Sequence, residues 1–589
     1  MVHKPHLASL RFGASVSGLF RSDGCVSHRW HPQPVKPQHK GNDLTDKTDN
    51  GTESSVEASE LPERRFPWRF PSIVLGLALV TSIVGPRFVD EDNSMESIVR
   101  VLTWLLTFVV LSVWWTFFSR LRWGTRFKGI GCAIGLFALF LLCFRFEGQA
   151  GNFIPQFSFR FSQSSEERAL EFFAKSSTKT SAEKSDTSLE STSDITTEFP
   201  VTDADWPRFG GPKGDHIAHG ETIRTDWETN PPQERWRHPV GPGWSSFAVV
   251  GDFAFTQEQR GESECVVCYD ANTGEQIWVH EDEARFEETA GGPGPRATPT
   301  IHDSRLYALG ATGILNCLDP RTGDQFWTTN IVEDNGGDLI EWAVAGSPVV
   351  YGDKVLVNPG TTTSFLAAYD RLTGQRIWKG PDGRAGYSTP VVATLAGTPQ
   401  IVMFTAEGVS GHSIATGDQW WMFPWTNATR INASQPIVLP DESIFVSTGY
   451  GGGSTLLDVS ETEGSWTAKS RWERSNKFKL KFNGGIQADD CVYGLDEGIL
   501  SCFDIEEGQR LWKKGRYQFG QILMVNGQLL VSTEKGKIVL VDVSRDSMAE
   551  VVDFQAIDGK TWNHPVLNRG RLFVRNGEEA ACYDLSPVE

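Results

Sequence analysis

The chain has 589 residues and a formal net charge of −19 at pH 7. That charge argues against a general nucleic-acid-binding protein, because such a protein needs a basic surface to neutralise phosphates, and no nucleic-acid partner is expected. The length exceeds that of one ordinary domain, although a propeller can form a long single unit. The composition has three regimes: an apolar region over 70–146, a region rich in Ser, Thr and Glu over 163–200, and alternating apolar and polar residues elsewhere.

Residues 1–66 are polar and lack a sustained apolar period, so we expect them to be disordered. Three apolar segments follow within residues 67–146, at about 70–86, 100–118 and 129–146, and each approaches the length of a membrane-spanning helix. The first is short, and buried helices of a globular domain are the alternative.

Charged residues flank these segments asymmetrically. Basic residues precede the first segment and fill the loop between the second and third, whereas the loop between the first and second is acidic. The positive-inside rule then predicts a multi-pass protein of the inner membrane, with a cytoplasmic N-terminus and everything after about residue 147 outside the cytoplasm. Residues 147–204 are expected to form a flexible tether, with a short helix at Ser165–Lys175.

A hairpin motif recurs in residues 205–589. Its clearest copy is Cys268–Trp278, in which an Asp whose carboxylate can accept from turn amides is followed by Gly274 and, four residues later, by Trp278. Copies spaced 40 to 51 residues apart indicate a propeller or a solenoid. Eight aromatic residues mark eight outer strands: Trp236, Trp278, Trp327, Trp378, Trp421, Trp472, Trp512 and Phe554.

The two ends of this region are expected to complete one blade. A single strand over Glu234–Pro239 lacks three partners, and the C-terminal end supplies three strands that lack a fourth. Pairing them closes the ring and removes both exposed edges. We therefore predict an all-β, eight-bladed propeller over 205–589, preceded by three transmembrane helices.

The hairpin motif, the eight blades and the terminal closure resemble the pyrroloquinoline-quinone (PQQ) repeat propellers. That superfamily includes quinoprotein alcohol dehydrogenases and non-enzymatic propellers such as the lipoprotein of the outer-membrane barrel-assembly machinery. The resemblance implies, for the enzymes, a vicinal disulfide over the quinone, a calcium ion and an Asp base. This chain has no adjacent cysteines, so no catalytic residue is transferred, and we expect no cofactor, no metal and no catalysis.

Cysteine and histidine pairs offer two further candidate sites. Cys265 and Cys268 have the spacing of a redox or zinc pair, but within a strand residues three apart point to opposite faces. The repeat-position cysteines Cys268, Cys317, Cys502 and Cys582 are interpreted as small buried core residues. His216 and His219 have the spacing of a metal pair but lack nearby partner ligands, so surface histidines are favoured.

Loops that join consecutive blades gather on one face of a propeller, at the mouth of its channel. Here they carry a set of basic and aromatic residues of the kind that anchors interfaces: Trp244, Arg285, Arg296, Trp342, Arg384, Tyr387, Arg430, Arg516, Lys560 and Trp562. Acidic residues in the same loops leave a solvated, salt-bridged rim as the alternative. The run Gly291–Pro295 within Val279–Ala297 is interpreted as a rigid connector, and a cradle for an anion is the alternative.

The sequence thus predicts a membrane-anchored, periplasm-facing propeller that binds a protein or peptide partner and acts as a scaffold. The alternative is a PQQ-dependent dehydrogenase with an atypical site. A third hypothesis, a sensor that signals inward, is weakened because residues 1–66 contain no recognisable output domain.

Overall fold

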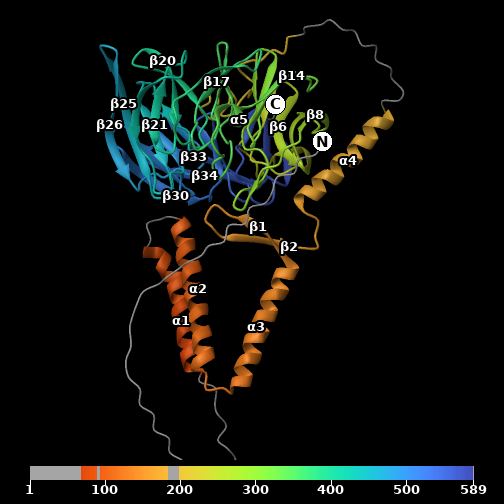
Figure 1. The fold of residues 1–589 in the computed structure, drawn as a ribbon, viewed down its shortest axis with the longest axis vertical. Coiled ribbons are helices and arrows are strands. Elements are labelled where there is room, and N and C mark those ends of the chain that lie inside the picture. Colours follow the sequence, from red (N-terminus) through yellow and green to blue (C-terminus); the bar gives the residue numbers. More distant parts are fainter. Residues whose placement is uncertain (1–67, 89–92, 184–197, 588–589) are drawn as a thin grey trace, which may run out of the picture. The chain divides into compact units, whose positions relative to one another are not determined.

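The computed structural model describes residues 68–88, 93–183 and 198–587. The N-terminal residues 1–66, predicted to be disordered, lie outside that set. The first described elements are the helices α1 (Arg69–Val84), α2 (Asn93–Phe117) and α3 (Trp123–Cys143), with a short 3₁₀ turn, η1 (Gly85–Phe88), after α1 (Figure 1).

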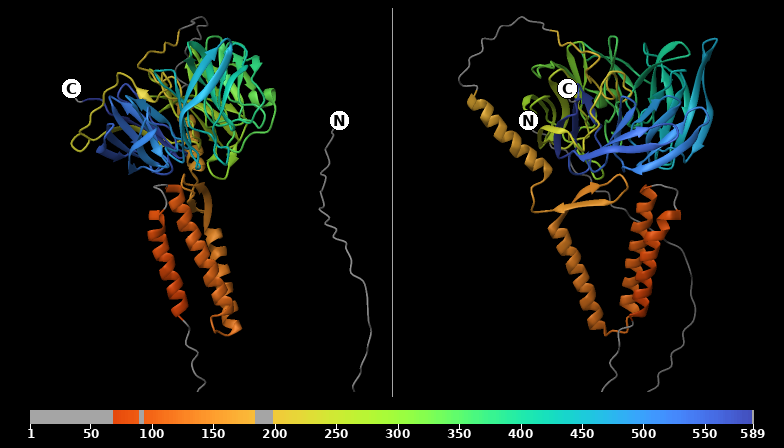
Figure 2. Two further views of the ribbon diagram at one scale, coloured as in Figure 1. Left: turned by 90° about the vertical axis from the view of Figure 1, so that its left-hand side faces the viewer. Right: turned by 180° about the vertical axis from the view of Figure 1, so that it is seen from behind.

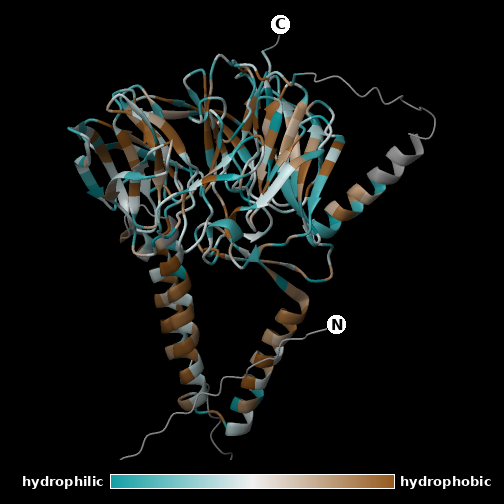
Figure 3. Ribbon diagram, turned by 45° about the horizontal axis from the view of Figure 1, so that its top comes forward, coloured by the Kyte–Doolittle hydropathy of each residue, from teal (hydrophilic) through white to brown (hydrophobic). Residues whose placement is uncertain are grey.

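Two of these helices are long and apolar enough to cross a membrane, over Met95–Phe117 and Trp123–Cys143. Few of their side chains are buried, unlike those of a core helix in a globular domain, and Figure 3 shows their hydrophobic colouring. The first predicted span, at about 70–86, corresponds to α1, which has 16 residues and is shorter than the about 20 residues that a bilayer requires.

The segment after α3 is folded where the sequence predicts a tether. Strands β1 (Phe144–Gln149) and β2 (Pro155–Phe159) form an antiparallel ribbon that continues directly from α3 (Figure 2). Helix α4 (Ser165–Glu183) follows, and its N-terminus has a capping box: the Ser164 hydroxyl accepts from the amide of Glu167 (3.1 Å), whose carboxylate accepts from the amide of Ser164 (2.7 Å). Ala169 and Phe173 of α4 are buried within a core cluster of the propeller.

The propeller consists of eight blades, each built on four antiparallel strands, and in the first seven blades these four strands follow one another in the chain. In the first three blades the strands are β5 (Ala248–Val250), β6 (Phe253–Arg260), β7 (Ser263–Asp270) and β8 (Gln276–Asp282); β11 (Thr300–His302), β12 (Arg305–Leu309), β13 (Ile314–Leu318) and β14 (Gln325–Asn330); and β15 (Val349–Tyr351), β16 (Lys354–Val357), β17 (Ala367–Asp370) and β18 (Arg376–Lys379). The fourth and fifth comprise β19 (Val391–Leu395), β20 (Thr398–Phe404), β21 (Gly408–His412) and β22 (Gln419–Pro424); and β23 (Ile437–Val438), β24 (Ile444–Thr448), β25 (Gly453–Thr462) and β26 (Ser465–Ser475).

The sixth and seventh blades comprise β27 (Gly485–Ala488), β28 (Cys491–Asp496), β29 (Ile499–Asp504) and β30 (Gln509–Arg516); and β31 (Gln521–Val525), β32 (Gln528–Ser532), β33 (Lys537–Val543) and β34 (Met548–Gln555). Short elements are present in addition to the four strands of each blade: β3 (Ile217–Ala218) pairs in parallel with β31, β9 (Glu287–Glu288) pairs with β10 (Gly292–Pro293), and α5 (Ile331–Asn335) follows β14.

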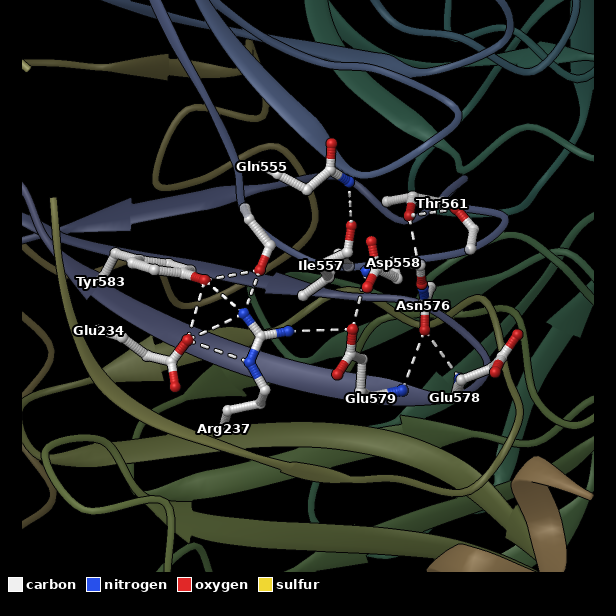
Figure 4. Close-up of polar contacts among 12 residues, drawn as sticks. Glu234, Arg237, Gln555, Ile557, Asp558, Thr561, Asn576, Glu578, Glu579 and Tyr583 are labelled. Carbon is white, nitrogen blue, oxygen red and sulfur yellow. Dashed lines mark hydrogen bonds and ion pairs between the residues drawn. The ribbon is translucent and has the colours of Figure 1, made fainter. Parts of the chain in front are cut away.

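The eighth blade closes the ring as predicted. Strands β35 (Val566–Asn568), β36 (Arg571–Arg575) and β37 (Glu579–Asp584) come from the C-terminal end, and β4 (Gln233–Pro239) pairs with β37 as the fourth strand. A polar cluster ties the closing strands to the preceding blade: Arg237 pairs with Glu234 and Glu579, and the Tyr583 hydroxyl donates to the carbonyl of Ala556 (Figure 4).

Consecutive blades are joined by the residues of the repeated hairpin. The indole N–H of Trp327 donates to the Arg371 carbonyl in the next hairpin turn (3.2 Å), and Gly374 of that turn lies under the Trp327 ring, where a Cβ would approach within 2.5 Å. The same indole-to-turn bond is made by Trp236, Trp278, Trp378, Trp472 and Trp512. The motif therefore specifies blade packing, as the sequence indicates.

Blade five is irregular, as its insertion predicts. Strands β25 and β26 form a long hairpin there, so Trp421 finds no glycine turn and donates to Gln400 of its own blade (2.6 Å). Trp420 instead stacks on Trp466 of the long hairpin, with ring centroids 5.0 Å apart. The eight described cysteines are free, and Cys265 and Cys268 belong to different core clusters, as opposite faces of β7 require.

Candidate functional site

A cavity of about 480 Å³ lies at the centre of the ring. Seven of the eight passages from one blade to the next contribute to its lining, and Gln521, the first residue after the remaining passage, also lines it, so the cavity lies on the propeller axis. We call the surface formed by these inter-blade loops the channel face. Of the ten residues predicted for a binding site, five line the cavity: Trp244, Arg296, Trp342, Tyr387 and Trp562.

Aromatic pairs form much of the wall. The rings of Trp244 and Trp562 are 4.8 Å apart, and those of Trp342 and Tyr387 are 5.2 Å apart. Lys560 lies over both rings of the first pair, with its ammonium 5.1 Å from the Trp244 centroid and 4.5 Å from the Trp562 centroid. Such an arrangement stabilises a desolvated cation through the ring quadrupoles.

The remaining predicted cations serve different purposes. Arg285 pairs with Glu166 of α4 (2.8 Å) and with Glu287 (3.1 Å), and Arg516 pairs with Glu96 of α2 (3.2 Å). These arginines hold the chain's own helices rather than forming an open binding surface.

Arg384 is partly exposed and Arg430 is exposed. Within the described residues neither makes an ion pair. The other predicted cations are bound by groups of this chain, so these two arginines are the ones left for a partner.

Arg296 stabilises the Gly291–Pro295 connector. Its guanidinium donates to the carbonyl of Gly292 (2.9 Å) and to that of Gly294, and it lies 3.5 Å from the carboxylate of Glu288. Burial lowers the pKa of Arg296 to about 10, while Glu288 and Glu264 oppose that shift. The connector is therefore rigid because a buried cation satisfies its carbonyls, and its anion-binding alternative finds no support in these contacts.

The ribbon that follows α3 reaches into the channel face. Gln149 is the last residue of β1, and residues 150–154 connect it to β2; Gln149, Ala150, Gly151 and Phe153 line the cavity. This contribution was not predicted from the sequence. A signal for the ribbon was available, since Phe144 and Phe146 alternate with polar residues in β1, which is the period of a strand.

Two histidines also line the cavity. His216 is 3% exposed and stacks on His564 with ring centroids 4.5 Å apart, and Phe209 contacts both rings edge-on. Burial lowers the pKa of His216 to about 4 and that of His564 well below its usual value, so both rings are neutral at pH 7. The interpretation of His216 as a surface histidine was wrong, whereas His219 is exposed and pairs with Asp215 (2.8 Å).

A second cleft, of about 910 Å³, shares Phe209, Ser347, Thr389 and Gln435 with the first. Arg208 and Lys213 contribute its cations. None of the ten predicted residues lines this cleft.

The cavity does not fit the quinoprotein constellation. Over 68–88, 93–183 and 198–587 no cluster of three His, Cys, Asp or Glu side chains could hold a metal ion, and no adjacent cysteines exist in the chain. The lining includes Glu288 and Glu341 but no Asp that would act as the base. Glu288 is already engaged, because it accepts from the amides of Ala290 (2.6 Å) and Gly291.

Comparison with known proteins points to the same propellers. Residues 262–514 match a family model described as outer membrane protein assembly factor BamB. BamB of Burkholderia pseudomallei is 25% identical over 226 residues, covering 37% of this chain and 55% of that protein. The 1-butanol dehydrogenase (quinone) of Thauera butanivorans is 29% identical over 139 residues, covering 22% of this chain and 20% of the dehydrogenase.

The chain thus spans about half of the BamB relative and a fifth of the dehydrogenase. Among solved structures, quinohemoprotein alcohol dehydrogenase from Comamonas testosteroni aligns with a TM-score of 0.49 at 13% identity, covering 66% of this chain and 81% of that one. BamB from Moraxella catarrhalis aligns with a TM-score of 0.44 at 14% identity, covering 61% of this chain and 99% of that one. The family match and the BamB relative, together with the eight blades of the ring, show a PQQ-like repeat propeller that is similar to BamB.

Proposed function

We propose that this protein is a membrane-anchored scaffold that binds a protein or peptide partner through the channel face and catalyses no reaction. The observation that carries the proposal is that the polar groups of this face already bind a main chain: Lys560 and Glu534 contact the backbone of Gln149 and Gly151. A surface of buried aromatics with such groups is suited to a polypeptide. The similarity to an outer membrane assembly factor supports the same class of function.

The anchor is proposed to be multi-pass. In this proposal α1, α2 and α3 all cross the inner membrane, the N-terminus is cytoplasmic and the propeller lies outside the cytoplasm. The basic loop between α2 and α3 supports that orientation. Reporter enzymes active on only one side of the membrane, fused after residue 66 and after residue 589, test it; reporters active on the same side would exclude three spans.

Partner binding is tested by crosslinking in cells followed by capture of the full-length protein. The double variant Arg384→Glu/Arg430→Glu reverses the two accessible cations of the channel face and should reduce capture about tenfold or more, because rim charges steer and retain a partner. The matched control is Lys213→Glu/Lys469→Glu, which makes the same charge change at exposed positions outside the channel face. Equal capture by both variants would exclude the channel face.

A PQQ-dependent dehydrogenase remains the second candidate. The observation in its favour is the aromatic cavity on the ring axis, together with the partial match to quinone-dependent dehydrogenases. Purified protein would be mixed with PQQ and calcium, and bound-quinone absorbance and dye reduction with alcohols would be measured. Bound quinone with dye reduction would replace the scaffold proposal by the enzyme.

A further inference from the structure

The channel face is occupied by the chain's own residues Gln149–Phe153, which we call the strap. Three backbone groups of the strap are bound by side chains of the propeller. The Gly151 amide donates to Glu534 (2.6 Å), the Gly151 carbonyl accepts from Lys481 (3.3 Å), and the Gln149 carbonyl accepts from Lys560 (3.4 Å). These three hydrogen bonds recognise the main chain of the strap rather than particular side chains.

The strap requires a glycine at one position. A Cβ on Gly151 would lie 2.3 Å from a ring carbon of Phe519, a residue that is fully buried and cannot move aside without disturbing its blade. Any other residue there would overpack the contact. The site therefore selects for glycine through shape.

The groups that hold the strap are desolvated and organised in advance. Lys481 and its ion-pair partner Glu497 are each 2% exposed, with 3.1 Å between them, and the Lys481 ammonium lies 4.1 Å from the centroid of the Phe519 ring. Glu534 is 3% exposed and also accepts from the Trp562 indole (2.8 Å). Within the described part of the chain, its second carboxylate oxygen is buried and accepts no hydrogen bond.

Buried charges are costly unless they are well paired. Lys481 and Glu534 are buried and Lys560 is partly buried, and their convergence on one short backbone segment indicates a built recognition site for an extended peptide. The unused oxygen of Glu534 is an acceptor for one further N–H.

We propose that the strap holds the channel face closed, and that the partner binds there through an extended, glycine-containing segment that makes the same main-chain contacts. This inference rests on the proposed function and specifies its partner. The strap is tethered close to the site, so its effective concentration is on the order of millimolar, and the partner must bind more tightly than the strap to displace it.

The first experiment tests whether the strap closes the face. Ala345, which lines the cavity, is replaced by Cys in a full-length background with Cys25, Cys132 and Cys143 changed to Ser, and maleimide labelling is timed. Gly151→Val should accelerate labelling about tenfold or more, because the clash with Phe519 favours the open state. Phe161→Val is the control, since this residue is 75% exposed and lies beyond the ribbon.

Lys560→Met provides a second route to opening without a steric clash. It removes the ammonium that holds the Gln149 carbonyl and preserves packing on Trp244 and Trp562. A smaller acceleration is expected. Unchanged labelling in both variants would overturn the strap.

The second experiment tests what the opened face recognises. A synthetic peptide spanning Arg145–Phe159 should bind full-length Gly151→Val protein about a hundredfold more tightly than wild type, because the wild-type site is occupied. The same peptide carrying valine in place of Gly151 should not bind. No binding of the glycine peptide to protein whose face labels as open would overturn the recognition of an extended segment.

The strap proposal and the proposed scaffold function would be contradicted by different results. If the glycine peptide binds the opened protein but partner capture is the same for wild type and Gly151→Val, the face recognises only its own strap, and the scaffold function falls while the strap stands. Capture that increases in Gly151→Val together with peptide binding supports both.

Discussion

The seams between blades and the channel face are built from the same residue types by opposite rules. At a seam, one tryptophan, one turn carbonyl and one glycine recur almost unchanged, as Trp327, Arg371 and Gly374 do. At the channel face no contact recurs: Lys481 and Lys560 come from two different inter-blade passages, Glu534 comes from the β32–β33 turn, and all three meet on one strap. Repetition marks the residues that build the ring, and its absence marks the residues that give this ring its own chemistry.

The largest expected effect lies at a seam. Trp327 is 8% exposed, and Trp327→Ala should lower the free energy of unfolding by about 3–5 kcal/mol, because it removes a large buried side chain and its bond to the next blade. Thermal unfolding in detergent checks this, with Trp327→Phe as the variant that retains most of the packing. If Trp327→Ala lowered the free energy of unfolding no more than Lys560→Met at the channel face, the contrast between the two regions would be contradicted.

Acid should destabilise both the blade seams and the channel face, so the contrast between the two regions does not extend to their pH dependence. Burial lowers the pKa of His216 at the channel wall and of His412 in blade four to about 4 each, against about 6.5 in an unfolded chain. The unfolded chain binds these protons more tightly, so the stability from each neutral ring is complete above pH 6.5 and is lost as the pH falls towards 4.

Each ring should contribute up to about 3 kcal/mol to that loss. His216→Asn is chosen because position 216 has a φ of +60°, which Asn tolerates. This variant should lose less unfolding free energy on acidification than wild type, by the contribution of one ring. Unfolding of wild type and variant at pH 7 and pH 4.5 measures it. An equal loss of stability in wild type and variant would show that protonation of His216 does not destabilise the folded state.

The parts of the molecule that the sequence predicts correctly are those that depend on local spacing. The Gly-to-Trp interval of four residues indicates the hairpins, and the incomplete blades at the two ends of residues 205–589 predict the pairing of β4 with β37. Half of the candidate site residues are predicted correctly for the same reason. Residues such as Trp342 and Tyr387 lie in inter-blade loops, and the number and spacing of the blades determine where those loops lie.

The other half depends on contacts between segments far apart in the chain. Gly151 meets Glu534, and Arg285 meets Glu166 of α4, at separations no local pattern records. Composition alone suggested a tether for residues 147–204, because a short ribbon and a Ser-rich helix resemble a linker until their partners are known. The burial of His216 was missed for the same reason, since its ring is covered by Phe209 and His564.

The smallest predicted effect isolates the seam contact itself. Gly374 and Gly397 have nearly the same backbone conformation, with φ of +73° and +72°, so replacing either by Ala costs a similar about 1–2 kcal/mol of backbone strain. At Gly374 the new methyl group would also meet the Trp327 ring, whereas at Gly397 it meets nothing within 4 Å. Gly374→Ala should therefore cost about 1–3 kcal/mol more than Gly397→Ala. Equal losses of melting temperature in the two variants would mean that the recurring glycine is required only for its turn, and that the tryptophan above it has room to move.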